Sequence, residues 1–249
     1  MLRLSMYILA MARRLFSPLR FYGILWKRGD IMKYRCLVLD HDDTVVDSTA
    51  SIHHPCFQEF LNLIRPGKKI SLEEYFSKNF GQNFLDFCRS EYGFTDEEIE
   101  REGRFWKSYA KDRVPKAFPG IGTLLWEQKR RGGLICVVSY SFSENILRDY
   151  ARNALPKPDR IFGWEEPLER RKPDPYPLFK LSEEFSLSKE DILVVDDAAL
   201  GMEMARAFGA DFAAAGWAHG ISSIRDQLRE RGCTVLEDVE SLCRLQFGA

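Results

Sequence analysis

Short apolar segments that alternate with longer amphipathic segments constrain the fold of this chain more than any other feature. The apolar segments carry β-branched or small residues on both faces and end at or before polar residues. The expected strands are Cys36–Leu39, Leu134–Val138, Arg160–Phe162, Ile192–Val195, Phe212–Ala215 and Thr234–Leu236. A strand with one solvated face would alternate apolar and polar residues, so these segments predict a parallel sheet that helices cover on both sides.

The segments between these strands have the spacing of helices. The expected helices are Ile121–Arg131, Ser143–Asn153, Pro175–Glu184, Gly201–Phe208 and Ser222–Glu230. Repeated strand–helix–strand units predict an α/β fold with an open, Rossmann-like parallel sheet. In such a sheet the ligand binds beyond the carboxyl ends of the strands, so the functional residues are expected there.

Residues 48–118 depart from this pattern because they contain no strand-like run. Four amphipathic helices are expected instead, at Pro55–Ile64, Ser71–Lys78, Asn83–Tyr92 and Asp96–Ala110. A chain of 249 residues is long enough for a large core and a smaller second one. We therefore expect an inserted all-helical domain at 48–118, which lies over the strand ends of a core made of residues 32–47 and 119–249.

The composition narrows the class of partner. With 45% hydrophobic and 29% charged residues, the chain is neither collagen-like nor globally disordered. The formal net charge of −1 provides no basic stripe for a phosphate backbone, so a nucleic-acid partner is not expected. The six cysteines form no C-x-x-C pair, which favours free thiols in the cytoplasm over a zinc site or a disulfide framework. We expect a monomer or a homodimer.

Residues 1–31 form a basic N-terminal extension with six basic residues and one acidic residue. Three interpretations stay open: sequence upstream of a natural start at Met32, an amphipathic segment on a membrane surface, or a targeting peptide. The first is favoured because Met32-Lys33-Tyr34-Arg35 leads directly into the first expected strand. The uncharged stretch Leu4–Ala12 is far shorter than the ~20 residues that span a bilayer, so a membrane is not expected as a partner.

Carboxylates gather where two of the expected strands end. The first strand is followed by Asp40, Asp42 and Asp43, and a later strand by Asp196 and Asp197. Carboxylates at the mouth of a buried sheet repel one another and are costly to desolvate unless a cation is present. Two such clusters at one sheet edge predict an oxygen-only site of the kind that Mg²⁺ prefers. Turn formation and helix capping are the alternative roles of these aspartates.

Two further side chains are expected at the same edge. Ser139 follows the strand Leu134–Val138, and Lys172 precedes Pro173 in a proline-flanked loop. Taken alone, the serine would be a helix cap or turn residue and the lysine a solvated charge. Beside a magnesium site, the hydroxyl group of Ser139 could instead hydrogen-bond an oxygen of a phosphoryl group.

The order of these residues resembles the haloacid dehalogenase-like superfamily, in its phosphoglycolate phosphatase and β-phosphoglucomutase branch. The motif Asp-x-Asp-x-Thr stands as Asp40-His41-Asp42-Asp43-Thr44, and it is followed by Ser139, Lys172-Pro173 and Asp196-Asp197. The segment Asp197–Ala210 also resembles that branch, and the resemblance covers residues 34 to about 240. It implies a Rossmann-like core with an inserted helical cap, as the pattern of strands and helices suggests independently.

The resemblance implies a Mg²⁺-dependent phosphatase that hydrolyses a small phosphorylated metabolite. Asp40 would attack phosphorus to form an aspartyl-phosphate, and Asp42 would protonate the leaving group and then activate water. Ser139 would orient the phosphoryl oxygens and Lys172 would balance their charge. The implied metal ligands are Asp40, Asp42 through its backbone carbonyl, Asp197 and, less firmly, Asp196.

Three positions depart from the family's usual residues. His41 stands where Leu is usual, Asp43 where Gly is usual and Tyr140 where Asn is usual. The additional carboxylate of Asp43 lies close to the implied metal, where it would turn outward, tune the charge of the site or weaken activity. The expected phosphate-binding residues are Asp43, Thr44, Ser139, Tyr140 and Lys172.

The cap would select the leaving group, and its sequence is less informative. The loop Phe80-Gly81-Gln82-Asn83 combines a flexible glycine with neutral hydrogen-bonding side chains, which makes Gln82 and Asn83 candidate substrate contacts. His53 is the third candidate. The alternatives are an ordinary connection between helices for the loop and a surface position for the histidine.

Two other functions stay open. A β-phosphoglucomutase-type phosphomutase would use the same core, but the family's mutases carry a cap histidine twelve residues after the nucleophile. That position is Ile52 here, and His53 comes one residue later, which favours hydrolysis. The other alternative is a catalytically weak binding or regulatory protein, which Asp43 and the basic extension would support.

Overall fold

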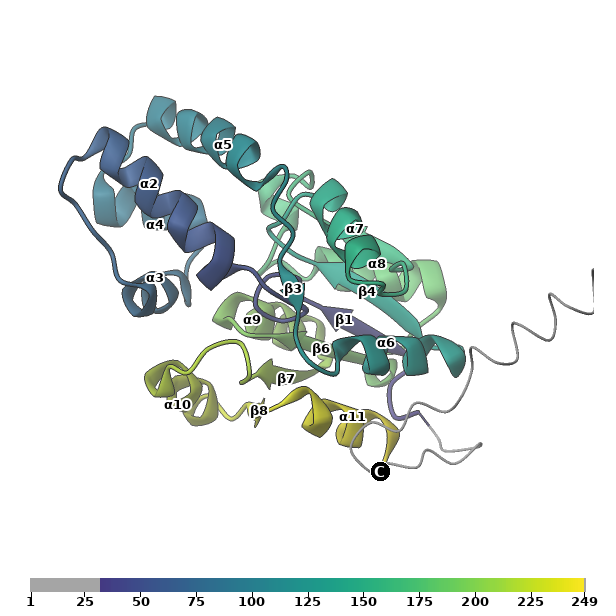
Figure 1. Cartoon of the computed structure of the whole chain (residues 1–249). Helices are drawn as coiled ribbons and strands as arrows, with labels where there is room; N and C mark the ends of the chain where they lie inside the picture. Colours follow the sequence, from purple (N-terminus) through teal and green to yellow (C-terminus); the bar gives the residue numbers. More distant parts are fainter. Residues whose placement is uncertain (1–31, 249) are drawn as a thin grey trace, which may run out of the picture.

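The computed structural model describes residues 32–248, so the basic extension and its three interpretations lie outside the described residues. A six-stranded sheet with the order β5-β4-β1-β6-β7-β8 forms the centre of the fold (Figure 1), and every pairing in it is parallel. The strands are β1 (Cys36–Leu39), β4 (Leu134–Val138), β5 (Arg160–Phe162), β6 (Ile192–Asp196), β7 (Asp211–Ala215) and β8 (Thr234–Leu236). The predicted α/β parallel sheet is therefore confirmed.

Helices cover both faces of this sheet, because alternate residues of each central strand point to opposite sides. Leu37 and Leu39 of β1 pack in one apolar cluster, on the side of α6 (Ile121–Arg130), α7 (Ser143–Arg152) and α11 (Val239–Phe247). Cys36 and Val38 pack in another, on the side of α8 (Tyr176–Phe185) and α9 (Ala199–Phe208). The helix α10 (Ser222–Glu230) packs against β7 next to α9.

The last helix, α11, is not among the helices expected from the sequence. Asp238 begins this helix by accepting a hydrogen bond from the backbone N–H of Ser241 at 2.7 Å. Its buried apolar side chains recur with helical spacing and join the cluster on one face of the sheet. Two short 3₁₀ helices, η2 (Leu168–Arg170) and η3 (Lys189–Asp191), complete the connections of the core.

Four helices lie together at the upper left of Figure 1, away from the sheet. They are α2 (His54–Ile64), α3 (Leu72–Asn79), α4 (Phe84–Tyr92) and α5 (Asp96–Ala110), and the π-helix η1 (Thr49–His53) precedes them. We call residues 49–110 the helical insertion. It has an apolar cluster of its own, centred on Phe57, Phe60 and Phe87, and so does not depend on the sheet for its interior.

Two contacts join the helical insertion to the core. At its base, β2 (Val46–Asp47) pairs antiparallel with β3 (Lys116–Ala117), although no strand was expected within residues 48–118. A two-residue strand is too short to show an alternating pattern, which explains the omission. At the end of α3, the carbonyl oxygen of Phe80 accepts a hydrogen bond from Ala199 N–H at 3.1 Å, and its ring packs with Met202.

Two findings bear on partners and on the thiols. Within residues 32–248 no helix has both the length and the apolar character that a membrane crossing requires. All six cysteines lie in this part of the chain as free thiols.

Candidate active site

Functional side chains gather where β4, β1 and β6 end side by side. The last residues of β1 pair in register with β4 on one side and with β6 on the other. Asp40, Ser139 and Asp196 each follow or end one of these strands, so they share one edge of the sheet. A cavity of about 660 Å³ lies between this edge and the helical insertion, and all three residues line it. The cavity is thus beyond the carboxyl ends of the strands, as a parallel sheet predicts.

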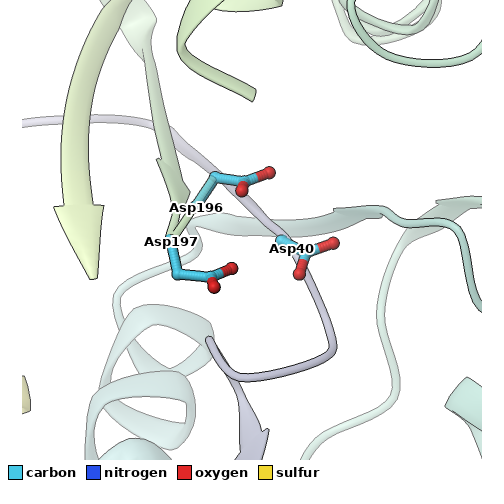
Figure 2. A group of neighbouring side chains, drawn as sticks. All are labelled: Asp40, Asp196 and Asp197. Atoms are coloured by element: carbon cyan, nitrogen blue, oxygen red, sulfur yellow. The ribbon is translucent and has the colours of Figure 1, made fainter. Parts of the chain in front are cut away.

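Three carboxyl groups form a cluster that suits a cation. Asp40, Asp196 and Asp197 each have a carboxylate oxygen within 4.8 Å of the others, and Figure 2 shows the three side chains at the ends of β1 and β6. Burial raises the pKa of Asp40 to about 6, and burial beside Asp196 raises the pKa of Asp197 well above its ordinary value. Oxygen donors that repel one another in this way fit a hard divalent cation such as Mg²⁺.

Lys172 separates the roles of the two neighbouring aspartates. Its buried Nζ donates to Asp40 Oδ1 at 2.8 Å and to Asp196 Oδ2 at 2.6 Å. Asp196 Oδ1 accepts from Ala198 N–H at 2.8 Å, so both oxygens of Asp196 are engaged by the protein. Within residues 32–248, Asp197 has no such side-chain partner. Asp197 is therefore the better placed of the two to bind a cation.

The carboxylate of Asp42 accepts three hydrogen bonds. Ser48 Oγ donates at 2.7 Å, His53 Nε2 at 2.9 Å and Ser141 Oγ at 2.5 Å. Burial by itself would raise the pKa of Asp42, but the charge and the hydrogen bond of His53 hold this pKa well below its ordinary value. Asp42 lines the cavity beside Asp40, where it can exchange a proton with a bound group.

His53 connects Asp42 to the helical insertion. Trp106 Nε1 lies 3.0 Å from His53 Nδ1 and donates to it in the neutral ring, whose proton then resides on Nε2 and faces Asp42. Burial lowers the pKa of His53, but the charge of Asp42 outweighs this effect and raises it. The wider turns of the π-helix η1 add one residue to the chain, which brings His53 rather than the buried Ile52 to Asp42.

Asp43 occupies a backbone conformation that explains the usual glycine at this position. Its φ angle is 58°, in the left-handed region that Asp tolerates better than most residues. Its Oδ1 accepts a hydrogen bond from Thr49 N–H at 3.1 Å, at the start of the helical insertion. Burial raises the pKa of Asp43 to about 7.

A second set of hydrogen bonds links the loop that follows β1 (residues 40–45, the candidate catalytic loop) to the helical insertion. His41, between the two carboxylates, bonds through Nε2 to Asp149 Oδ2 on α7 at 3.1 Å, and both side chains are buried. The other oxygen of Asp149 accepts from Arg148 Nε at 2.8 Å. Arg148 Nη1 donates to the carbonyl oxygens of Ala110 and Lys111, each at 3.0 Å, at the end of α5.

Comparison with known proteins assigns this architecture to a family. The family model of the haloacid dehalogenase-like hydrolases matches residues 37–215. The chain belongs to this family. The match includes the three strand ends and the loop that carry the predicted motifs, and it makes the chain an enzyme of a hydrolase family.

Similar proteins agree with the predicted branch of the haloacid dehalogenase-like hydrolases. The 6-phosphogluconate phosphatase of Escherichia coli K12 is 26% identical over 181 residues, which are 69% of this chain and 77% of that protein. A predicted phosphoglycolate phosphatase from Haemophilus somnus 129PT superposes with a TM-score of 0.68 at 17% identity, over 86% of this chain and 99% of that one. A protein from Bacteroides vulgatus named for the β-phosphoglucomutases gives a TM-score of 0.67 at 18% identity, over 85% and 86% of the two chains. The structural matches show the common fold.

Most of the residues predicted from the sequence of this hydrolase line the cavity. The predicted residues that line it are Asp40, Asp42, Asp43, His53, Gln82, Ser139, Tyr140, Lys172, Asp196 and Asp197. Thr44 does not: its side chain is fully buried, and its hydroxyl group has no hydrogen-bond partner within residues 32–248. Asn83 does not either: its Oδ1 accepts from Asp86 N–H at 3.0 Å and begins α4. Both residues therefore have structural roles in this conformation.

The helical insertion and the loops bring further residues to the site that were not predicted from the sequence. Ser141 lies two residues after the predicted Ser139 and bonds Asp42. Trp106, on α5, donates a hydrogen bond to His53. Glu102 was not singled out at all, although it lines the cavity from α5. An acidic residue on the apolar face of an amphipathic helix was the available signal for Glu102.

Proposed function

We propose that this protein is a Mg²⁺-dependent phosphatase that hydrolyses a small phosphomonoester through an aspartyl-phosphate on Asp40. One observation carries the proposal: Asp40, Ser139, Lys172 and Asp197 come from four separate segments and line one cavity. A carboxylate nucleophile, a hydroxyl group, an ammonium group and a further carboxylate are what phosphoryl transfer to aspartate requires. The family to which the chain belongs supports the same chemistry.

Each of these groups has a distinct task. Asp40 attacks phosphorus and forms the covalent intermediate, which divides one difficult hydrolysis into two easier steps. Lys172, which already bonds Asp40, compensates negative charge on the phosphoryl oxygens, and the Ser139 hydroxyl orients them. When bound by Asp40, Asp197 and the backbone carbonyl of Asp42, Mg²⁺ supplies positive charge that screens the repulsion between carboxylate and phosphate.

Asp42 handles the proton. An ester oxygen needs a proton in order to leave, and Asp42 is the acidic residue of this cavity that is nearest to Asp40 along the chain. Because its lowered pKa keeps Asp42 ionised in this conformation, it would take this proton from the protonated form of His53, whose Nε2 lies at 2.9 Å, and pass it to the leaving oxygen. In the second step the same carboxylate removes a proton from the water that attacks the intermediate. His53 Nε2 donates a hydrogen bond to the Asp42 carboxylate, and the hydroxyl groups of Ser48 and Ser141 hold this carboxylate in place.

The helical insertion acts as a cap in this proposal. Residues 48–118 form the cap domain, and residues 32–47 and 119–249 form the core. The cap covers the strand ends, excludes bulk water and contacts the leaving group. The similarity to a 6-phosphogluconate phosphatase supports a small phosphorylated metabolite as substrate. The six free thiols support a reducing compartment such as the cytoplasm.

Phosphate release from p-nitrophenyl phosphate tests the proposed function. Purified protein should release phosphate with Mg²⁺ and lose this activity with excess EDTA. Asp40→Asn should lower kcat by about 10³-fold or more, because the nucleophile is removed while its shape is retained. Exposed Asp112, replaced by Asn, is the matched control and should leave the rate unchanged. Activity that survives Asp40→Asn would refute the aspartyl-phosphate route.

A phosphomutase is the second candidate, and one observation favours it. Although the histidine is displaced by one residue in the sequence, the π-helix brings His53 to Asp42, where a cap histidine of the mutase type would act. Incubation with a hexose 1-phosphate and the corresponding bisphosphate, followed by ³¹P NMR, separates the two functions. A phosphatase releases inorganic phosphate, whereas a mutase forms the isomeric hexose phosphate with little release.

A further inference from the structure

Glu102 is a buried acid that the proposed chemistry does not use. Glu102 lies on α5 in the helical insertion, is only 5% exposed and lines the cavity. Its carboxyl group has no hydrogen-bond or ion-pair partner within residues 32–248. An unpaired buried carboxyl group destabilises a protein, so its presence in a cavity wall points to a ligand.

The other acids that line the cavity are accounted for. Asp40 and Asp196 bond Lys172, Asp42 accepts three hydrogen bonds, and Asp43 accepts one from Thr49. Glu100, at the exposed side of α5, lies 3.7 Å from Arg104. In the part of the chain that the structure describes, only Asp197 and Glu102 lack a partner among them. Asp197 belongs to the cation cluster and Glu102 does not.

Within residues 32–248 no cationic side chain forms an ion pair with Glu102, although the nearby charge of His53 lowers its pKa. Its neighbour His53 has both ring nitrogens engaged, by Asp42 and by Trp106. Lys107, on the same helix, lies over the Phe142 ring at 4.4 Å from its centroid. Burial raises the pKa of Glu102 to about 7, in agreement with a carboxyl group that lacks a positive partner.

Aromatic side chains surround this acid. Trp106 lies one helical turn after Glu102 on the same face of α5, and Tyr75 on α3 lines the cavity with its ring buried. Tyr75 is close enough for Glu102 to raise the pKa of its hydroxyl group. This end of the cavity therefore combines flat apolar walls with a hydrogen-bonding carboxyl group and a phenol. Such a lining holds a small group with a carbon skeleton and a hydrogen-bond donor.

We propose that Glu102 is a specificity-determining residue whose carboxyl group binds a hydrogen-bond donor, a hydroxyl or an ammonium group, on the leaving group of the substrate. This inference rests on the proposed phosphatase function and adds a determinant to it. In the proposed function the phosphoryl group binds beside Asp40 and Lys172 at the sheet edge, and Glu102 would contact the end of the leaving group that faces α5. A leaving group that carries a carboxylate at that end is disfavoured, because it would meet the carboxylate of Glu102.

Three matched substrates test this inference. Propyl phosphate has no donor on its leaving group, glycerol 3-phosphate has two hydroxyl groups, and 3-aminopropyl phosphate has an ammonium group. The wild-type enzyme should prefer one or both donor-bearing esters over propyl phosphate by about tenfold to hundredfold in kcat/KM. Glu102→Gln, which has nearly the same shape, should bring the three values within about threefold. The ester whose value falls most identifies the donor as hydroxyl or ammonium.

The controls separate specificity from folding and from the proposed function. Glu97→Gln alters an exposed acid on the same helix and should leave the ratios unchanged. Circular dichroism melting confirms that Glu102→Gln is folded. If Glu102→Gln changes all three kcat/KM values by the same factor, or if the wild type prefers propyl phosphate, the role of Glu102 is refuted while the phosphatase stands. If no ester, including p-nitrophenyl phosphate, is hydrolysed with Mg²⁺, the proposed function fails and this inference fails with it.

Discussion

At the scale of single residues, the left-handed backbone at Asp43 controls the turn between the catalytic loop and the helical insertion. Its φ of 58° costs a residue with a Cβ about 1 kcal/mol relative to Gly, and less for Asp or Asn. The side chain also satisfies Thr49 N–H, which is buried. The position therefore selects for glycine or for a short side chain that can accept a hydrogen bond.

A substitution series at Asp43 tests whether the left-handed backbone and the hydrogen bond to Thr49 both contribute to stability. Asp43→Asn keeps both the tolerated backbone and the acceptor and carries no buried charge, so it should be at least as stable as the wild type and the most stable of the three variants. Asp43→Ala loses the acceptor and keeps the backbone penalty, and it should be less stable by about 2 kcal/mol. Asp43→Gly should fall between them. Urea denaturation measures the order, and an alanine variant as stable as the glycine variant would contradict the left-handed turn.

Glu102 predicts a dependence of stability on pH. Its pKa is about 7 in the folded protein and near 4.5 in the unfolded chain. The folded state therefore holds this proton more tightly, and the stability that the proton gives is complete below pH 4.5 and is lost as the pH rises to 7. Glu102→Gln, which has no proton to lose, should be more stable than the wild type by about 2–3 kcal/mol at pH 8. Most of this gain should vanish at pH 5 in denaturant titrations; a gain that is independent of pH would contradict the raised pKa.

The motif residues at the strand ends were predictable because each directly follows a short apolar strand that is recognisable in the sequence. Asp40 and Asp197 each follow a buried strand, so their shared edge followed from the parallel sheet alone. The partners from the helical insertion were not predictable, because the contact between Trp106 and His53 joins positions 53 residues apart. Asn83 shows the opposite case: its loop suggested substrate binding, but its side chain satisfies the first turn of α4.

At the scale of elements, α7 holds both the catalytic loop and the end of the helical insertion. Arg148 donates hydrogen bonds to carbonyl groups at the end of α5 and to Asp149, and Asp149 in turn bonds His41. One turn later, Asn153 bonds Pro115 O and Ala117 N on the strand that leads back to the core. The Leu that is usual at position 41 in the family has no polar atom to bond Asp149, so this connection depends on His41.

Removal of Arg148 tests the connection. Arg148→Met leaves two carbonyl groups without their donor, so kcat/KM for a phosphomonoester should fall by about tenfold. Exposed Arg152 on the same helix, replaced by Met, should have no effect. In a double-mutant cycle with His41→Leu, the two losses should be coupled by at least ~0.5 kcal/mol. Additive losses would show that the two side chains act independently.

Two elements escaped prediction for opposite reasons. The π-helix η1 has no sequence signature, because its extra residue is stabilised by contacts of His53 and Thr49 that form only in the folded protein. The helix α11 does have a signature, a capping Asp238 and buried residues at helical spacing, and it could have been predicted. Whether a helix is of the α or π type thus depends on tertiary contacts, whereas the presence of a helix is often encoded by the local sequence.

At the scale of the whole molecule, the helical insertion and the core meet around a shared set of buried charges. The paired strands β2 and β3 attach the insertion at one end, and Phe80 docks it on α9 at the other. Between these contacts the cavity brings together acids from both parts. The fold therefore concentrates negative charge in one place, and a bound cation should stabilise the entire protein.

Magnesium should consequently raise the thermal stability of the folded protein. A ligand that binds only the folded state adds about 1.4 kcal/mol of stability at ten times its Kd, and the gain grows with concentration. Titration of Mg²⁺ in a melting experiment should therefore raise Tm progressively. Asp197→Asn removes the one carboxylate of the cation cluster that has no hydrogen-bond partner within residues 32–248. Because repulsion within the cluster is relieved, the Tm of this variant should be higher than that of the wild type without Mg²⁺. Its Tm should respond little to added Mg²⁺. Asp112→Asn, an exposed control, should respond like the wild type. Equal Mg²⁺ shifts in the wild type and in Asp197→Asn would place the cation elsewhere.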